Sequence, residues 1–531
     1  MQIKKDKVLL IALLLLSLIM FFYRLGAPSL FETDEVIYSQ ISKQIVQSGD
    51  WITLRFFNEK WFIHPPLYMW LISASSYLFG TGEFNTRLWN ALFAVGLVYI
   101  TYLLGRKMFK DGVGLLAGFI LATSLQYLIQ ARIAVFDIPE VFFMTASILF
   151  FIHWLEDNKP AYYYLSFLAM GLAVLTKGPV GIVLPVLVLT AYLAATKELN
   201  KLFNPRLIIG FIIAYIIGGT WYTAELILHG REFIDSIFGF YTLERYFRPI
   251  ETHYGPWYFY IFVVVFGFIP WISFLPYSIK YQWKMKGDND NLFTVLWLGI
   301  VFLFFTLAGT KLPGYIMPFY PFAAISVAKM ISDHISGEDS GLDMEVSNSH
   351  KTLLIFSLIL LFIGISARIF ESPEGYETII SNLSFSMMII GIGGLTATYL
   401  FKSTRKVLYS VIVLGITMFI FSIYTANFTM ITLDDFKPMK LISQKVRSQY
   451  MNGEVIIGYR VLNKGSFQYY MEKNIKWLGN PQELAICLKN TSGRIYLITN
   501  ISDYLGIDQD IKKLLFLVYR SGDMVLISNM K

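Results

Sequence analysis

Residues 31–38 read Phe-Glu-Thr-Asp-Glu-Val-Ile-Tyr, and residues 62–67 read Phe-Ile-His-Pro-Pro-Leu. The first stretch sets two adjacent carboxylates, Asp34 and Glu35, shortly after an apolar segment that is long enough to cross a bilayer. Carboxylates this close to hydrocarbon are costly, so they usually face a cavity filled by water or substrate. The alternative is that they only begin a surface helix, where acidic side chains stabilise the N-terminal end.

The composition sets the class of protein. The chain has 531 residues, of which 55% are hydrophobic, 17% aromatic and only 15% charged. A soluble domain typically carries about 25% charged residues, so we expect a polytopic membrane protein. The net charge of +7 then reports the orientation of loops rather than nucleic-acid binding. The single cysteine, Cys487, excludes an intrachain disulfide framework and a cysteine-based zinc site.

Apolar segments and basic clusters together predict about thirteen transmembrane helices. The first, Val8–Tyr23, follows lysines that the positive-inside rule places in the cytoplasm, and no signal-peptide cleavage site follows it. We therefore expect a multi-pass protein of the cytoplasmic (plasma) membrane, with its N-terminus inside and its C-terminus outside. The remaining expected spans are residues 86–107, 112–130, 138–155, 162–176, 179–195, 206–222, 257–280, 291–309, 313–331, 351–368, 383–401 and 406–424.

Two segments in the first outer loop, residues 26–85, are expected to lie in the interface. Asp34–Ser48 repeats isoleucine every four residues between polar side chains, which is typical of an amphipathic helix. Pro66–Phe79 is apolar but too short to be a comfortable span. This choice puts the basic cluster after the next span in the cytoplasm, as the charge rule favours.

The character of the chain changes after Tyr424. Residues 434–450 form an amphipathic helical pattern, and short β-rich runs at 454–459, 494–499, 515–519 and 524–528 alternate with a helical pattern at 481–488. This alternation predicts a small α/β domain. We expect a transmembrane domain over residues 1–424 and an extracytoplasmic domain over 425–531. The polar stretch 332–350 is expected to be a cytoplasmic loop.

With this topology, several charged residues gather on the outer face. Each has a simpler interpretation, because cations at helix ends anchor headgroups and an aspartate before Ile-Pro can cap a helix. Positive-inside bias, however, should deplete outer cations, and here they recur beside acids. Such a set suits an anionic, lipid-linked substrate and general-base chemistry. Its members are Asp34, Glu35, Arg87, Arg132, Asp137, Lys177, Glu244, Arg245, His253 and Lys311.

A sugar carried on a polyprenyl phosphate meets these requirements. Cations at the phosphate would stabilise the charge that develops as the glycosidic bond breaks. A carboxylate on the opposite side would deprotonate an acceptor hydroxyl, which gives single displacement with inversion. We therefore expect a glycosyltransferase whose acceptor is a lipid, a protein or a glycan, with Asp34 as the general base.

Two other classes of protein compete with this interpretation. A transporter or lipid flippase for an anionic substrate would also bury charges, but transporters usually show paired repeats and broken midplane helices, and neither is evident in the sequence. A scaffolding membrane protein would leave the outer acids and cations unexplained. Transfer of a labelled sugar to an acceptor would distinguish a glycosyltransferase from both of these classes.

Motifs along about the first 330 residues share their order with a known family. They are the Asp34-Glu35 loop, Ser48-Gly49-Asp50-Trp51, His64-Pro65-Pro66-Leu67, Arg87-Leu88, Ala131-Arg132 to Asp137, Thr176-Lys177-Gly178-Pro179, Leu243-Glu244-Arg245-Tyr246, Gly255-Pro256-Trp257 and Lys311-Leu312-Pro313. In these motifs the chain resembles the GT-C glycosyltransferases of the protein O-mannosyltransferase and lipid A aminoarabinose transferase group. The resemblance implies a mainly α-helical fold of about thirteen spans, interfacial helices in the first outer loop and an exterior C-terminal domain.

The resemblance also implies roles for individual residues. Asp34 matches the family's catalytic aspartate and Glu35 its neighbour, Asp137 matches the aspartate of the second loop, and Arg87 matches a basic residue at the lipid phosphate. Asp34, Glu35 and Asp137 are therefore the expected catalytic residues. Binding of the donor phosphate or the substrate is assigned to His64, Arg87, Arg132, Lys177, Lys311 and Tyr315.

The chain departs from the aminoarabinose enzymes at two places. An arginine of that family is replaced by Ile37, and a Glu-Lys pair by Ile63-His64. The metal of some of those enzymes would need a glutamate at position 63 and a further histidine, so we predict no metal and no cofactor.

Overall fold

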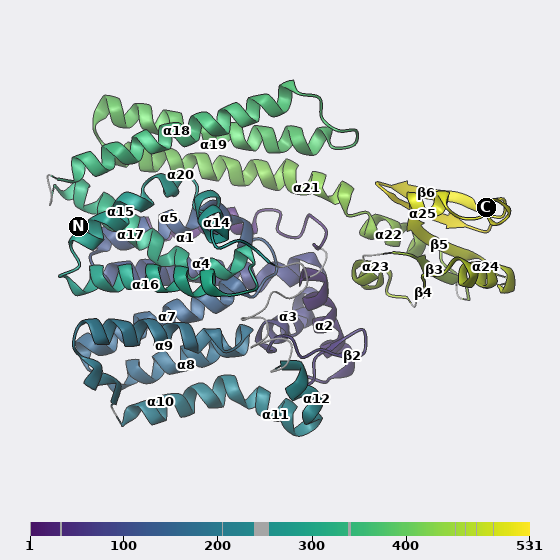
Figure 1. Cartoon of the computed structure of the whole chain (residues 1–531), viewed down its shortest axis with the longest axis horizontal. Coiled ribbons are helices and arrows are strands. Elements are labelled where there is room, and N and C mark those ends of the chain that lie inside the picture. Colours follow the sequence, from purple (N-terminus) through teal and green to yellow (C-terminus); the bar gives the residue numbers. More distant parts are fainter. Residues whose placement is uncertain are drawn as a thin grey trace.

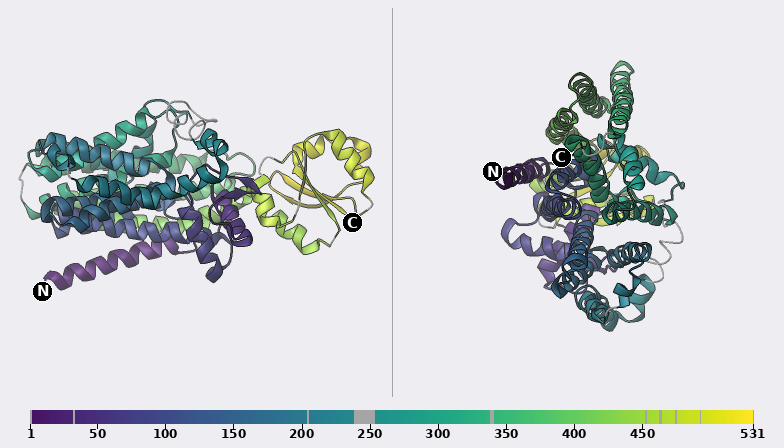
Figure 2. Two further views of the ribbon diagram at one scale, coloured as in Figure 1. Left: turned by 90° about the horizontal axis from the view of Figure 1, so that it is seen from below. Right: turned by 90° about the vertical axis from the view of Figure 1, so that its left-hand side faces the viewer.

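The computed structural model describes residues 2–31, 34–203, 205–237, 254–337, 341–451, 453–461, 464–473, 475–491 and 493–530. It consists of a helical bundle with a small sheet domain attached at one end (Figure 1). The N-terminus lies at the opposite end of the bundle from the sheet domain (Figure 2). The prediction of a mainly helical chain with a small C-terminal α/β domain is therefore confirmed.

Helices occupy the ranges in which spans were expected. Within the described residues, seven helical runs are long and apolar enough to cross a membrane, or eight if a pair of helices bent by 115° forms one span. The bent pair is Phe259–Gly267 with Trp271–Lys284, and Pro270 between them cannot donate a backbone hydrogen bond. The seven are Glu83–Met108, Asp137–Asp157, Arg206–His229, Asn289–Leu307, Leu342–Ile369, Glu377–Thr404 and Val407–Phe436. The count of thirteen stays a prediction.

The bundle elements have the following bounds. They are α1 (Gln2–Phe22), α4 (Glu83–Met108), α5 (Asp111–Ala122), α6 (Leu125–Gln130), α7 (Asp137–Asp157), α8 (Pro160–Lys177), α9 (Val180–Ala195), α10 (Arg206–Ala214), α11 (Thr220–His229), α12 (Arg231–Ile234), α14 (Phe259–Gly267), α15 (Leu275–Lys284), α16 (Asn289–Leu307), α17 (Phe319–Ser336), α18 (Leu342–Ile369), α19 (Glu377–Thr404) and α20 (Val407–Tyr424). Three short helical segments continue α20 beyond its expected end at Tyr424. They are η6 (Thr425–Thr429), α21 (Met430–Thr432) and η7 (Leu433–Phe436).

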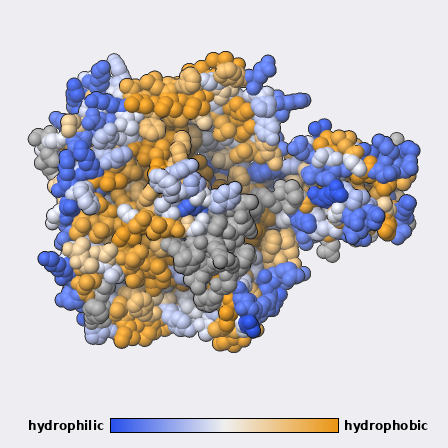
Figure 3. All heavy atoms as spheres, viewed as in Figure 1, coloured by the Kyte–Doolittle hydropathy of each residue, from blue (hydrophilic) through white to orange (hydrophobic). Residues whose placement is uncertain are grey.

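The bundle has an apolar interior and an apolar exterior. Inside, the rings of Trp297 and Phe322 stack with centroids 4.5 Å apart, and α4 and α5 cross so closely that a Cβ at Gly114 would overlap a backbone carbonyl of α4. Outside, hydrophobic residues cover the face of the bundle, while hydrophilic residues gather at its end and on the sheet domain (Figure 3). Phe362 of α18, for example, is 72% exposed. Such a surface is suited to contact with the hydrocarbon of a membrane.

The first outer loop folds as two helices with a short hairpin between them. α2 spans Asp34–Ser48, as predicted, and α3 spans Leu67–Phe79, one residue shorter than expected. The antiparallel strands β1 (Arg55–Phe56) and β2 (Glu59–Lys60) join them. Figure 1 places α2 and α3 at the end of the bundle that faces the sheet domain.

The C-terminal part forms a five-stranded sheet in the order β4-β3-β5-β7-β6. β3 pairs in parallel with β4 and β5, whereas β7 is antiparallel to both of its neighbours. The strands are β3 (Val455–Tyr459), β4 (Lys476–Leu478), β5 (Ile495–Asn500), β6 (Phe516–Ser521) and β7 (Met524–Ser528), and the helices are α22 (Met439–Gln449), α23 (Lys464–Met471), α24 (Pro481–Asn490), α25 (Ile501–Leu505) and α26 (Gln509–Lys512).

Three local expectations need correction. The sequence predicted four of the five strands, because the short edge strand β4 has no clear alternating pattern. The amphipathic helix expected from Asp434 begins at Met439, directly after Pro438. The polar stretch 332–350 is largely helical where it is described, since α17 runs to Ser336 and α18 begins at Leu342. Polar composition alone therefore did not indicate where these helices end.

Candidate functional site

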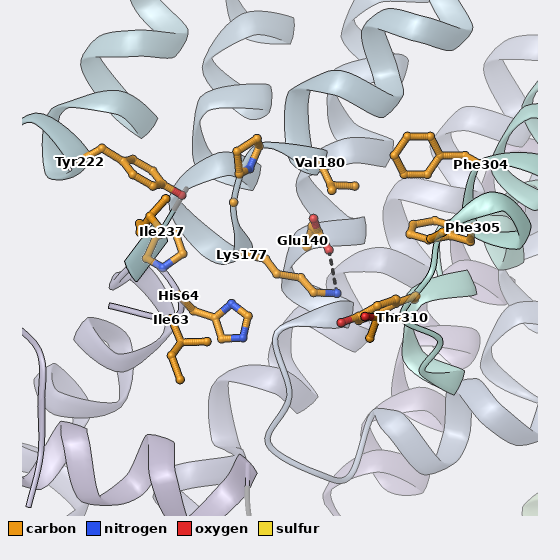
Figure 4. Close-up of a pocket in the computed structure, with 15 residues that line it drawn as sticks. Ile63, His64, Glu140, Lys177, Val180, Tyr222, Ile237, Phe304, Phe305 and Thr310 are labelled. Atoms are coloured by element: carbon orange, nitrogen blue, oxygen red, sulfur yellow. Dashed lines mark ion pairs between the residues drawn. The ribbon is translucent and has the colours of Figure 1, made fainter. Parts of the chain in front are cut away.

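A cavity of about 150 Å³ lies where the helix ends meet the first outer loop. Its polar lining comes from His64, Glu140, Lys177, Tyr222, Thr310 and Tyr315. Its apolar lining includes Ile63, Val180, Ile237, Phe304, Phe305 and Ala308. Figure 4 shows Lys177 reaching into the middle of these side chains, between His64 on one side and Phe305 and Thr310 on the other. The cavity is therefore amphiphilic, with one cluster of charge against a hydrophobic wall.

The charge cluster is built from the facing ends of two helices. Lys177, the last residue of α8, places its Nζ 2.5 Å from Oδ1 of Asp137 and 3.3 Å from Oε2 of Glu140. The two acids lie three residues apart in the first turn of α7, and so they share one face of that helix. A cation at the end of one helix and acids at the start of another also suit both helix dipoles. The ring of Tyr315 lies below the ammonium, at 4.8 Å from its centroid.

Glu140 has hydrogen-bonding capacity to spare. Its side chain is only 4% exposed, and Oε1 accepts no hydrogen bond from the part of the chain that the structure describes. Leaving a buried carboxylate oxygen without a donor is costly, so this oxygen is available to a donor group of a ligand. Sequence reasoning missed Glu140, although the spacing Asp-x-x-Glu across a first helical turn could have indicated it.

The loop that carries Lys311 and Tyr315 passes directly against Asp137. A Cβ added at Gly314 would overlap the Asp137 carboxylate and would also approach the side chain of Gln130. Only glycine allows this approach without a shift of either element. The glycine at position 314 is therefore explained by the close approach of this loop to Asp137.

Tyr38 connects the two aspartates that the sequence singled out. Burial raises the pKa of Tyr38 well above its usual value, and the negative charges of Asp34 and Asp137 raise it further. Asp34 also hydrogen-bonds the Tyr38 side chain and is itself exposed. The charges of both carboxylates thus act on one hydroxyl, although the two residues are about 100 positions apart in the sequence. Tyr38 was not singled out from the sequence, where it looks like any aromatic residue of an amphipathic helix.

An aromatic layer joins this pair of acids to the cavity. The ring of Phe136 lies 4.1 Å from that of Tyr38 and 4.8 Å from that of His64, measured between centroids. The ring of Trp61 also packs against that of His64, with the two centroids 5.7 Å apart. His64 therefore lines the cavity from a fixed position, as its place before two prolines suggests.

Glu35 and Arg87 form a separate and closed cluster. They are 2% and 1% exposed, and two parallel hydrogen bonds of 2.8 and 2.7 Å join them. The other three guanidinium donors bind the carbonyl oxygens of Leu25, Pro28 and Ser29. The Glu35 carboxylate also accepts from two backbone amides, at residues 31 and 134. All five donors of Arg87 are thereby used within the protein.

Arg132 and Lys311 bind the ends of helices. Arg132 donates to the carbonyl oxygens of Met20 and Tyr23 at the end of α1, at 2.6 and 2.7 Å. Lys311 donates to Thr306 and Ala308 at the end of α16, at 2.6 and 2.9 Å. Burial lowers the pKa of Lys311, and it lowers the pKa of Arg132 to about 10. Both side chains satisfy carbonyl groups that a helix end leaves open.

The structure therefore divides the predicted residues into two groups. In the first group, His64, Lys177 and Tyr315 line the cavity. Asp137 pairs with Lys177, and the charges of Asp34 and Asp137 both act on Tyr38. Glu35, Arg87, Arg132 and Lys311 make their observed bonds with other parts of the protein. Glu244, Arg245 and His253 lie outside the described residues. In the described ranges, no three His, Cys, Asp or Glu side chains gather closely enough to hold a metal ion.

Comparisons with known proteins agree with this fold. Residues 63–221 match the family model of dolichyl-phosphate-mannose-protein mannosyltransferases. The chain superposes on ArnT from Cupriavidus metallidurans, solved with undecaprenyl phosphate bound, with a TM-score of 0.82 and 22% identity over 98% of each chain. The chain therefore has the GT-C fold. An oligosaccharyltransferase from Archaeoglobus fulgidus has the same GT-C fold, with a TM-score of 0.53 and 12% identity over 94% of this chain and 70% of that one.

Relatives by sequence match part of this chain. An uncharacterized protein of Aquifex aeolicus is 32% identical over 59% of this chain and 62% of its own length. An undecaprenyl phosphate-α-4-amino-4-deoxy-L-arabinose arabinosyl transferase of Pseudomonas fluorescens is 30% identical over 55% of this chain and 54% of its own length. The chain thus spans less than two thirds of the length of these curated relatives.

Proposed function

We propose that this protein is an integral membrane glycosyltransferase that moves a sugar from a polyprenyl-phosphate donor to a lipid, protein or glycan acceptor. The observation that carries the proposal is the amphiphilic cavity, in which Lys177 stands beside an apolar wall that includes Phe304 and Phe305. An isoprenoid phosphate has the same division into a charged head and an apolar chain. The named relatives use undecaprenyl phosphate-linked 4-amino-4-deoxy-L-arabinose, so that donor is the first one to test.

Lys177 is the proposed contact of the donor phosphate, with His64 and Tyr315 beside it. As the glycosidic bond breaks, negative charge grows on the phosphate, and a cation held ready at that point lowers the barrier. Asp137 and Glu140 hold the ammonium in place. Arg132 and Lys311 are proposed to support this site by holding the ends of α1 and α16, since their donors bind backbone carbonyls there.

Asp34 is the proposed general base. Its carboxylate is exposed, lies in the first turn of α2 and shares Tyr38 as a neighbour with Asp137. It would take the proton of the acceptor hydroxyl while the phosphate leaves on the opposite side, which inverts the configuration of the sugar. Glu35 and Arg87 are proposed to hold the acid loop, because Glu35 binds backbone amides on both sides of the site.

The proposed location of the reaction is the outer face of the cytoplasmic membrane. The basic N-terminus and the first outer loop lie at opposite ends of the bundle, and the sheet domain lies at the same end as the loop (Figures 1 and 2). Positive-inside bias then directs the site and the C-terminal domain outward. Cysteine labelling at positions 107 and 177 should report opposite sides of the membrane.

Transfer of radiolabelled sugar from a polyprenyl-phosphate donor in membranes tests the function. Asp34→Asn should lower the rate about 10²- to 10⁴-fold, which is the usual contribution of a general base. Glu59→Gln is the matched control, because Glu59 is an exposed acid of the same outer loop. Transfer that Asp34→Asn leaves unchanged would contradict the assignment of the base. Label that crosses the bilayer but stays on its lipid would favour a flippase instead.

A further inference from the structure

We propose that the C-terminal domain positions the loop that carries Asp34, and that Tyr470 is the residue through which it does so. The inference rests on the proposed function, because it concerns the placement of the proposed base. It assigns a catalytic purpose to a domain in which the sequence shows no catalytic motif. The contacts between the domain and the bundle carry the argument.

The first set of contacts grips the chain just before Asp34. The backbone amide of Leu30 donates to the Tyr470 hydroxyl at 2.8 Å. The amide and hydroxyl of Ser29 donate to the Asp434 carboxylate at 2.9 and 2.7 Å, and Lys437 donates to the Ser29 carbonyl at 3.0 Å. Side chains from the part of the chain after the bundle thus bind the backbone groups of two consecutive residues, Ser29 and Leu30.

A second set of contacts holds α2 itself. Ser39 donates to the hydroxyl of Tyr469 at 2.8 Å, and Lys43 pairs with Glu472 at 2.6 Å. Ser39 and Lys43 lie on the same short helix as Asp34. Contacts that hold the turns with Ser39 and Lys43 therefore also fix the position of the first turn, which carries Asp34. Figure 1 shows α22 and α23 on the side of the domain that faces the bundle.

Tyr470 also contacts α4, the helix whose Arg87 binds Glu35 of the acid loop. Its hydroxyl donates to Oε1 of Glu83 at 3.2 Å, and Lys440 pairs with the same oxygen at 2.5 Å. Glu83 begins α4, which carries Arg87 one turn later. One hydroxyl therefore bridges the acid loop, through Leu30, to the start of α4.

The contact between the domain and the bundle also includes buried apolar side chains. Leu30, Val36 and Tyr469 are 2%, 1% and 6% exposed and form one buried apolar cluster, against which Tyr470 packs. Ser29 and Glu35 are thereby bound by Arg87 on the bundle side, and Leu30 is bound by Tyr470 on the domain side. A displacement of a catalytic group by about 1 Å can cost about 10²-fold in rate, so a hold on both sides has a direct consequence for catalysis.

The test uses the full chain and the smallest change that removes the bridge, Tyr470→Phe. We expect kcat for sugar transfer to fall about 5- to 10-fold, mainly through loss of the shorter hydrogen bond from Leu30, while KM for the donor stays unchanged. Tyr504→Phe is the matched control, because Tyr504 lies on α25 and outside these contacts. Amide hydrogen exchange of residues 29–43 is the second measurement, and it should quicken about 10-fold in Tyr470→Phe alone.

The two measurements separate the possible outcomes. Faster exchange together with a lower kcat supports the inference. Exchange at the wild-type rate overturns it, and so does a wild-type kcat despite faster exchange. If Tyr470→Phe does not fold, Ser39→Ala removes the neighbouring bond to Tyr469 and should change both readouts in the same direction. Absence of sugar transfer by the wild type would refute the proposed function, whereas exchange would still decide whether the domain holds the loop.

Discussion

The cluster around Lys177 and the cluster around Arg87 contain the same kinds of groups but differ in what remains unbound. Lys177 lies in a cavity between Asp137 and Glu140, and one oxygen of Glu140 lacks a donor among the described residues. Arg87 is 1% exposed, and the protein uses all five of its donors. A charged group with unused hydrogen-bonding capacity beside a cavity can bind a ligand. A charged group whose hydrogen bonds are all made within the protein is suited to stabilising the fold.

The largest effect is expected from breaking the closed cluster. Arg87→Met should destabilise the protein by about 3–5 kcal/mol, because it leaves the buried Glu35 carboxylate without its partner. The double variant with Glu35→Leu should recover much of this loss, since it removes the stranded charge. Thermal unfolding of the purified protein measures both. A single variant as stable as the wild type would show that the pair is not structural.

The open cluster should show its largest response in activity. Lys177→Ala should lower kcat/KM for the polyprenyl-phosphate donor about 10²- to 10³-fold, because it removes the cation proposed at the leaving phosphate. Lys159→Ala, at the exposed start of the same helix, is the control and should act like the wild type. A loss smaller than about twofold in Lys177→Ala would move the phosphate site elsewhere.

Glu140 tests whether an unused hydrogen bond marks a substrate contact. Glu140→Gln keeps the shape of the side chain but removes its charge, and so it should lower kcat/KM about 5- to 10-fold through a weaker bond to the ligand. Steady-state kinetics with Glu156→Gln, at the exposed far end of α7, provides the comparison. Equal kinetics for the two variants would mean that the free oxygen of Glu140 has no role in binding.

The smallest effect concerns the ion pair between Lys43 and Glu472 at the domain contact. Burial acts to raise the pKa of Glu472, but hydrogen bonding to Lys43 and the nearby cations outweigh it and lower that pKa below 4.5. Its contribution to stability is therefore present at neutral pH and is lost as the pH falls through the lowered pKa. Glu472→Gln should cost at most about 1 kcal/mol at pH 7 and nothing at low pH. A difference in unfolding that does not change with pH would contradict this sign.

The fold and the candidate site were not equally accessible from the sequence. Periodicity predicted α2 and most of the sheet, because a buried face imposes a repeat on the sequence. Charge next to a span end predicted the meeting of Asp137 with Lys177, since helix ends on one side of a membrane lie near each other. The same signal could not separate Lys177 from Arg132 and Lys311, whose long side chains reach back to open carbonyls at helix ends.

Other residues carried a weaker signal or none. The spacing of Glu140 from Asp137 places both on one face of a helix but does not indicate Lys177 as the partner of Glu140, and nothing in the sequence relates Tyr38 to Asp137. Tyr470 lies in a segment whose pattern reports only a small α/β domain. Sequence patterns record which face of an element is buried, but they do not record which partner covers it.

A structure of the protein with a polyprenyl phosphate bound tests the central claim most directly. The account predicts that a phosphate oxygen lies within hydrogen-bonding distance of Lys177 Nζ, with the isoprenoid chain along Phe304 and Phe305 and the Asp34 carboxylate facing the reacting carbon. A phosphate bound instead by Arg87 or Arg132, or at the end of the bundle that carries the N-terminus, would contradict it.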